Sequence, residues 1–180
     1  MPVGTPILVA TQSPLSPIDT ATPGGKSIDL NLKSEAFMEG MFIPKKFTGD
    51  SMDVSPALSW NKPPIGTRSF AIICDDSDAT AGVWTHWVIF NIKSDTTSLP
   101  ENVPKLLQIM GTVKQGANSF GRIGYYGPKP PPGSPHRYLF KIYALDKELA
   151  LPAASRKVEI EKAMEGHILA RGQLMGQYKR

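Results

Sequence analysis

The stretch Ser69-Phe70-Ala71-Ile72-Ile73-Cys74-Asp75 is the strongest fold signal in the chain, because it is nearly continuous in apolar side chains. Such runs are typical of a strand near the centre of a sheet, where both faces are covered. Two further strand-like runs occupy residues 84–92 and 138–145. Alternation predicts that the first of these presents one face made of Trp84, His86, Val88, Phe90 and Ile92. The same rule groups His136, Tyr138, Phe140, Ile142 and Ala144 in the other.

Weaker patterns predict the remaining elements. Short strands are expected at residues 28–32, within 37–47 and at 55–60. Ser155 is the expected N-cap of a helix that ends near Gly166, and a final strand is expected over residues 170–178. A second short helix is expected around residues 103–110. Together these elements predict a mainly β protein: a two-sheet antiparallel β-sandwich with a few short peripheral helices.

Composition places the 180 residues in the ordinary globular class, with 41% hydrophobic and 20% charged residues. Residues 1–27, rich in Pro, Ser and Thr, predict an extended arm, and residues 28–180 predict a single domain. The net charge of +4 is scattered, which argues against a nucleic-acid partner. The single cysteine, Cys74, is expected to be a buried, inert thiol.

No signal peptide is evident, and no segment approaches the ~20 apolar residues that a membrane-spanning helix needs. The sequence therefore predicts a soluble, cytoplasmic protein without a transmembrane segment.

Two distant segments carry most of the chemistry-bearing side chains. The first is Asp75-Asp76-Ser77-Asp78, followed by Trp84-Thr85-His86-Trp87. The second is Gly127-Pro128-Lys129-Pro130-Pro131-Pro132-Gly133, followed by His136-Arg137-Tyr138. In an antiparallel sheet, the end of one strand and the start of its neighbour share an edge, so Asp76, His86 and His136 should meet.

Each of these residues alone fits a structural role, as a turn aspartate or as a core histidine with a satisfied hydrogen bond. Together they are costly to bury without a purpose. A carboxylate bonded to a histidine favours the imidazolium, and two imidazoles with the Tyr138 hydroxyl could bind phosphate or carboxylate. Gly127 and Pro128 would form a stiff rim, and Trp84 and Pro128 apolar walls.

Three other functions are compatible with parts of this pattern. A metal-dependent enzyme could use the two histidines and an aspartate as iron or zinc ligands, although their spacing matches no local metal motif. A serine hydrolase is weaker, because residues 116–121 have one residue too many before Ser119 for a nucleophile elbow. A regulatory module that binds another protein, with the pocket as its control site, is the third possibility.

His167, on an apolar helix face, is expected to be structural.

These motifs resemble those of the phosphatidylethanolamine-binding proteins, also called Raf kinase inhibitor-like proteins, and most closely their prokaryotic branch. The family pattern D-P-D-x-P then W-x-H-W is similar to residues 76–80 and 84–87. The pattern G-P-x-P-P-x-G then H-R-Y is similar to residues 127–133 and 136–138. The resemblance covers about residues 30–180, and residues 118–121, 144–146, 166–167 and 176–178 also fit the pattern.

The resemblance implies a large antiparallel sheet packed on a smaller one, and a pocket for phosphate-like anions that include phosphoethanolamine head groups. It implies no catalytic residue, metal or cofactor. It also implies a possible kinase or protease partner and a possible homodimer. The family's ligand-binding positions carry over onto Asp76, His86, Pro128, His136 and Tyr138, with Trp84 nearby. Asp78 and Gly127, in the same motifs, complete the predicted ligand-binding set.

The chain departs from the family pattern at three positions. Ser77 and Thr80 replace both prolines of D-P-D-x-P, which predicts a more flexible loop. Lys129 stands where many prokaryotic relatives carry cysteine. The lysine adds a cation near the rim of the expected pocket.

Overall fold

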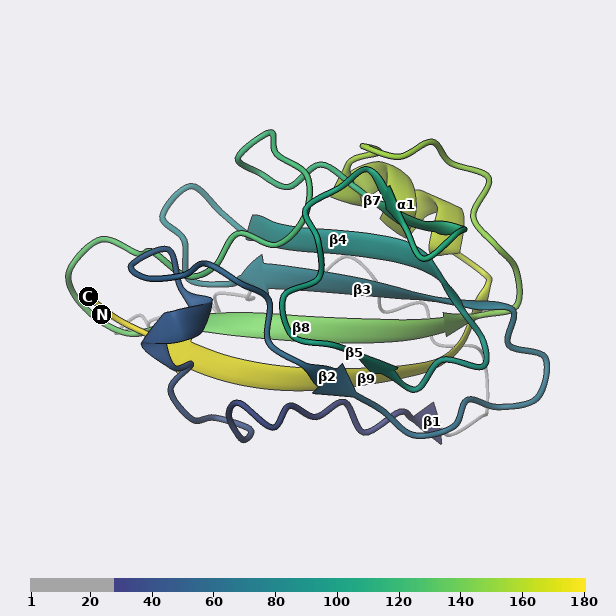
Figure 1. The fold of residues 1–180 in the computed structure, drawn as a ribbon, viewed down its shortest axis with the longest axis horizontal. Helices are drawn as coiled ribbons and strands as arrows, with labels where there is room; N and C mark the ends of the chain where they lie inside the picture. The colour runs from purple at the N-terminus through teal and green to yellow at the C-terminus, as the bar shows by residue number, and fades with distance from the viewer. Residues whose placement is uncertain (1–27) are drawn as a thin grey trace, which may run out of the picture.

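A seven-stranded sheet forms the centre of the protein, whose computed structural model describes residues 28–180 (Figure 1). The predicted arm, residues 1–27, lies outside the described residues. The strands of the large sheet are β1 (Ile28–Asp29), β3 (Ser69–Asp76), β4 (Trp84–Lys93), β6 (Gln108–Ile109), β7 (Val113–Gln115), β8 (His136–Leu145) and β9 (Ile168–Tyr178). A small second sheet pairs β2 (Leu58–Ser59) with β5 (Ser98–Leu99).

The large sheet is mixed, with the strand order β1-β9-β8-β3-β4-β7-β6. Its inner pairs are antiparallel, but β1 runs parallel to β9, so the prediction of a purely antiparallel sandwich was too specific. No short hairpin joins β1 to β9, so their relative direction is not forced. The strand β1 is also shorter than the predicted 28–32, because Asn31 has φ 50° and leaves the extended conformation.

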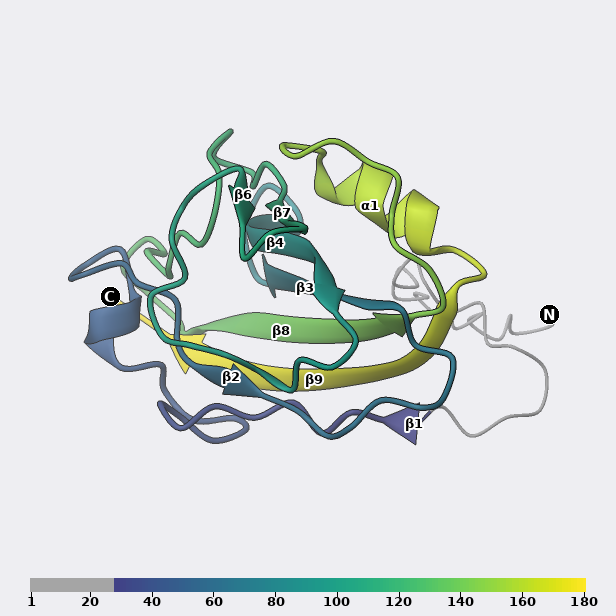
Figure 2. The same cartoon turned by 45° about the vertical axis from the view of Figure 1, so that its right-hand side comes forward.

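Both faces of the large sheet are covered, as the continuous apolar run in β3 predicts. Phe70, Ile72 and Cys74 join the cluster that contains Leu58 and Leu99 of the small sheet. Ala71 and Ile73 point to the other face, where the helix α1 (Lys157–Met164) contributes two buried side chains, Ile160 and Met164. Figure 2 shows this helix on one side of β3 and β8, with β2 on the other. Cys74 is buried, and burial raises the pKa of its thiol, as expected for an inert side chain.

Two bulges interrupt the alternation that the sequence predicts for β4. Pairing with β3 skips Asn91, which has φ 58°, and it skips His86 between Thr85 and Trp87. The predicted single face from Trp84 to Ile92 is therefore wrong. Ile92 joins the cluster on the small-sheet side, whereas Val88 and Phe90 pack on the helix side. A bulge reorients the side chains that follow it, and this is the physical reason for the difference.

Helical structure is scarcer than predicted within the described residues, which hold α1 and one turn of 3₁₀ helix, η1 (Lys45–Phe47). The predicted helix around 103–110 is wrong. Side-chain and backbone N–H groups of Gln115 bind the carbonyls of Pro104, Leu106 and Leu107, so these carbonyls are not free for a helix. Only a single bridge, from Phe42 to Gln177, forms where a strand was predicted within 37–47.

The helix α1 begins one residue later than predicted. Arg156 is its N-cap: the Arg156 backbone N–H donates to the Glu159 carboxylate at 2.7 Å, while the Ser155 hydroxyl donates to the Pro152 carbonyl. The helix ends before Gly166, whose φ is 74°, as predicted. His167 is only half-buried and contacts the carboxylate of Asp146 at 2.8 Å.

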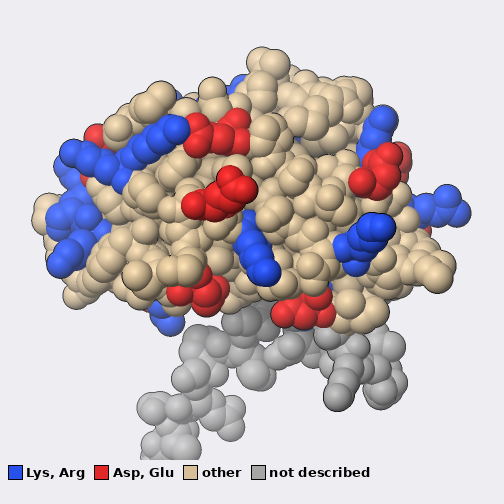
Figure 3. Space-filling view, turned by 60° about the horizontal axis from the view of Figure 1, so that its bottom comes forward, with Lys and Arg blue, Asp and Glu red and all other residues tan. Residues whose placement is uncertain are grey.

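Charged side chains of both signs share the surface. Figure 3 shows Lys and Arg side chains among Asp and Glu side chains over much of one face. Several form ion pairs, such as Lys46 with Glu101. No helix among residues 28–180 has the length and apolar character that a bilayer crossing requires.

Candidate functional site

Three strands meet at one end of the large sheet, and this meeting brings the two sequence motifs together. Asp76, the last residue of β3, is paired in register with Trp84 of β4 and with Tyr138 of β8. His136 begins β8 on the same face as Tyr138. Antiparallel pairing thus places Asp76, His86 and His136 at one end of the sheet, as the sequence predicts (Figure 1, left).

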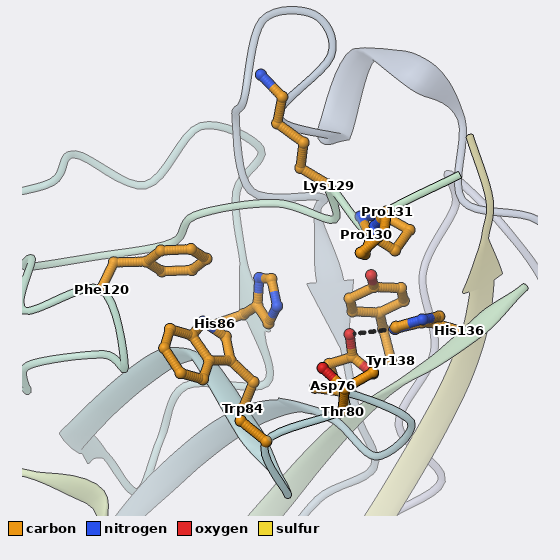
Figure 4. Close-up of a pocket in the computed structure, with 12 residues that line it drawn as sticks. Asp76, Thr80, Trp84, His86, Phe120, Lys129, Pro130, Pro131, His136 and Tyr138 are labelled. Atoms are coloured by element: carbon orange, nitrogen blue, oxygen red, sulfur yellow. Dashed lines mark hydrogen bonds and ion pairs between the residues drawn. The ribbon is translucent and has the colours of Figure 1, made fainter. Parts of the chain in front are cut away.

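A cavity of about 220 Å³ opens at this end of the sheet (Figure 4). It is lined by strand ends and by two loops that follow or precede them. Its lining residues are Asp76, Ala79, Thr80, Ala81, Trp84, His86, Phe120, Lys129, Pro130, Pro131, His136 and Tyr138. Such a volume suits a small ligand group rather than a large cofactor.

The carboxylate of Asp76 organises one wall of the cavity. Its Oδ2 lies 2.7 Å from Nδ1 of His136, and its Oδ1 accepts the backbone N–H of Asp78 at 2.9 Å. Since a carboxylate accepts, Nδ1 of His136 carries the proton in this pair. Asp76 is 4% exposed, so the pair holds the imidazole in one orientation at the edge of the cavity.

His86 owes its orientation to the bulge in β4. Its Nδ1 donates to the Tyr126 carbonyl, and Thr85 on one side is held by Ser119, whose hydroxyl accepts the Thr85 N–H at 2.8 Å. The ring makes edge contacts with Phe120 and Tyr138 at centroid distances of 5.3 and 5.2 Å. Burial lowers the pKa of His86, against the opposing effect of its bond to Tyr126 and of nearby carboxylates.

Tyr138 carries the most unusual polar atom of the cavity. The residue is fully buried, yet its hydroxyl has no hydrogen bond of normal length among the described residues, although the Asp76 carboxylate lies near it. Burial, together with Asp76, raises the pKa of this phenol, so it stays a neutral donor. A buried hydroxyl without a partner is costly, and it faces a cavity that a ligand could fill.

Three predicted ligand-binding residues do not line the cavity. Asp78 forms a two-pronged ion pair with Arg137, which lowers the pKa of Asp78 to about 2. Gly127 and Pro128 are buried behind the wall: the Gly127 N–H donates to Asp53 at 2.6 Å, and the Pro128 carbonyl accepts from Gly49 at 2.9 Å. These two residues fix the loop, while the next three residues of the loop form the wall.

The cavity also contains residues that the sequence did not single out as ligand-binding. They are Ala79, Thr80, Ala81, Phe120, Lys129, Pro130 and Pro131. Phe120 is the largest, 45% exposed, and it packs on Trp84 at 5.5 Å between ring centroids. Its position within a glycine-rich turn, where a large aromatic side chain has little to pack against, was the available signal.

The metal-site alternative finds no support in the geometry. Among residues 28–180, no three His, Cys, Asp or Glu side chains are arranged to hold a metal ion. Asp76 binds the ring nitrogen of His136 directly, and Nδ1 of His86 is engaged by the Tyr126 carbonyl.

Comparison with known proteins agrees with the motifs. The profile of a family described as "Phosphatidylethanolamine-binding protein" matches residues 33–179. A protein of Methanothermobacter thermautotrophicus described as "UPF0098 protein" is 48% identical over 151 residues, which cover 84% of this chain and 99% of the relative.

Two solved structures are also similar. A putative phosphatidylethanolamine-binding protein homolog, CT736 of Chlamydia trachomatis, superimposes with a TM-score of 0.77 and 36% identity, over 86% of this chain and 99% of that one. YbcL of E. coli, described as a member of the mammalian PEBP family, gives a TM-score of 0.78 and 28% identity, over 84% and 99% of the two chains.

Proposed function

Because the chain belongs to the phosphatidylethanolamine-binding protein family, we propose that it binds a small phosphate-like anion in the cavity at the end of its large sheet. The phosphate of a phosphoethanolamine head group is one such ligand. We also propose that the protein acts by binding rather than by catalysis, and that it works in the cytoplasm.

The observation that carries this proposal is the Tyr138 hydroxyl. It is a buried donor at the wall of the cavity, without a hydrogen bond of normal length among the described residues. His136, held by Asp76, stands on the same strand and lines the same cavity. An oxyanion that enters the cavity can accept a hydrogen bond from the phenol, beside the ring that Asp76 orients.

Replacing Tyr138 by phenylalanine separates binding from folding. Removal of a buried hydroxyl that lacks a partner should leave the stability unchanged or raise it by about 1 kcal/mol. The same change should weaken phosphate binding about tenfold, because the ligand loses a hydrogen bond. Thermal unfolding and isothermal titration calorimetry with inorganic phosphate measure the two effects.

Tyr143, also on β8 but on the helix-side face, offers the matched control. Tyr143→Phe should leave phosphate affinity unchanged. Equal phosphate affinity in wild type and Tyr138→Phe would count against a ligand role for the Tyr138 hydroxyl.

Anion affinity should also depend on pH. Burial lowers the pKa of His86 from its ordinary value, so the free protein carries a neutral ring at neutral pH. An oxyanion oxygen beside this ring needs a proton between the two acceptors, so binding takes up protons and weakens as pH rises through neutrality. Calorimetric titrations with phosphate across this range test the sign. A constant affinity would contradict it.

A second candidate is a regulatory module that contacts a kinase or protease around the cavity. Exposed apolar side chains favour it: Phe120, which lines the cavity, is 45% exposed, and Val83, next to Trp84 in the sequence, is 57% exposed. Phosphate in the cavity would then control the contact. Pull-down experiments with and without phosphate distinguish this role from simple ligand binding.

A further inference from the structure

The hydrogen bonds around His86 fix which ring nitrogen carries the proton. Its Nδ1 contacts the Tyr126 carbonyl, and the Tyr126 N–H donates back to the His86 carbonyl at 3.0 Å. A carbonyl oxygen can only accept, so Nδ1 is the protonated nitrogen of the neutral ring. Edge contacts with the rings of Phe120 and Tyr138 restrict rotation of the imidazole.

The other nitrogen, Nε2, is therefore a hydrogen-bond acceptor whenever the ring is neutral. No protein group among residues 28–180 donates to it, and the ring lines the cavity. Figure 4 shows the ring between Phe120 and Tyr138, within the space that a ligand would occupy. An oxyanion placed there meets a lone pair from His86 rather than a donor.

Fixed charges inside the cavity also oppose a fully ionised ligand. Asp76 of β3 faces the cavity, with His136 of β8 as its partner. The one lysine in the lining, Lys129, extends from the exposed loop at the rim. Two other carboxylates near His86 already have cationic partners, since Lys105 pairs with Asp53 and two lysines pair with Asp75.

We propose that the cavity selects oxyanions that bring their own proton: the ligand oxygen facing His86 is a hydroxyl, which donates to Nε2. Phosphate and phosphate monoesters can carry such a proton near neutral pH, whereas sulfate cannot. The ligand then presents an unprotonated oxygen to the Tyr138 hydroxyl. This inference rests on the proposed function, because it concerns the ionisation state of the ligand in the same cavity.

The test compares inorganic phosphate with sulfate, two tetrahedral oxyanions of similar size. At about pH 7.5, where the His86 ring is neutral, phosphate should bind at least about tenfold more tightly than sulfate. The reason is that a sulfate oxygen and Nε2 of His86 are both hydrogen-bond acceptors, with no proton between them. The gap should narrow as pH falls, because a protonated ring can donate to sulfate. Isothermal titration calorimetry in two buffers of different ionisation enthalpy should also detect proton uptake with phosphate.

The possible results are distinguishable. Equal affinities for phosphate and sulfate at about pH 7.5 would overturn the proposed selection of protonated oxyanions but not anion binding itself. Phosphate binding without proton uptake would do the same. Binding of neither anion at any pH would overturn the proposed function itself. A preference for phosphate that grows with pH and proceeds with proton uptake would support the inference.

Two variants sharpen the assignment to His86. The amide of His86→Gln can present either N–H or oxygen to a ligand, so the gap between phosphate and sulfate should fall below about threefold. Lys129→Ala removes only the cation at the rim, so it should weaken both anions and preserve the gap. Should His86→Gln fail to fold, the ratio of phosphate to sulfate affinity in the wild-type protein at about pH 7.5 still decides the question.

Discussion

Replacing Asp75 by alanine is expected to lower the free energy of unfolding by about 3 kcal/mol, because it breaks a buried ion-pair network. The Asp75 side chain is 0% exposed and lies on the helix-side face of β3. Its carboxylate binds Lys157 of α1 at 2.8 Å, Lys141 of β8 at 3.2 Å and the Thr85 hydroxyl at 2.9 Å. Removing it leaves two half-buried lysines and a hydroxyl without their acceptor.

Chemical denaturation of the variant measures this loss. Glu101→Ala is the matched control, because its ion pair with Lys46 is at the surface and should contribute less than about 1 kcal/mol. A loss for Asp75→Ala no larger than that of the control would mean that the buried network contributes little to stability.

Gly127→Ala is expected to cost about 3 kcal/mol and to weaken phosphate binding, because a side chain at this position has no space. An added Cβ would lie 2.2 Å from the Phe47 carbonyl oxygen and 2.8 Å from Cα of Thr48, which are backbone atoms that cannot rotate away. Relief requires the loop to move, and the same loop carries Lys129, Pro130 and Pro131 into the cavity wall.

Gly49→Ala provides the control for this prediction, because Gly49 lies on the segment that contacts the loop, where its N–H binds the Pro128 carbonyl. Its added Cβ would lie 3.1 Å from Cβ and Cδ of Lys129, and a shift of a few tenths of an ångström relieves these contacts. We expect a loss below about 1 kcal/mol. Denaturant unfolding and phosphate titration of both variants are the measurements, and equal behaviour would contradict the close-approach argument.

The large elements and the meeting of the two motifs could be predicted from the sequence, for a simple reason. Long apolar strands constrain each other strongly, and antiparallel neighbours bring the C-terminal end of β3 beside the N-terminal ends of β4 and β8. Asp76, His86 and His136 follow from that geometry. The contact between Asp76 and His136 needs only adjacent strands in register.

The bulges and irregular segments could not be predicted from the hydrophobic pattern, because they depend on partners far away in the chain. The bulge at His86 is held by Ser119 and Tyr126, which no alternation rule reveals. Likewise, the Gln115 side chain binds the carbonyls of Pro104 and Leu106, so residues 103–110 do not form the predicted helix. Such side-chain contacts to a distant backbone decide irregular structure, and period counting is insensitive to them.

The hydrogen-bonding roles of the cavity side chains also could not be predicted from the residue types alone. Two histidines and a tyrosine predict a set of donors for an anion. The structure gives His86 an acceptor facing the cavity and leaves Tyr138 as a donor without a partner. Which nitrogen carries the proton depends on the Tyr126 carbonyl, a backbone group that contributes no signal to a motif.

The central claim is that a phosphate-like anion occupies this cavity, and an amide NMR titration of the full chain with inorganic phosphate tests it most directly. At about pH 6, the account predicts saturable shifts confined to the strand ends and loops around Asp76, His86, Phe120 and His136, and their loss in Tyr138→Phe. Shifts that do not saturate, or that spread over surface lysines remote from the cavity, would contradict it.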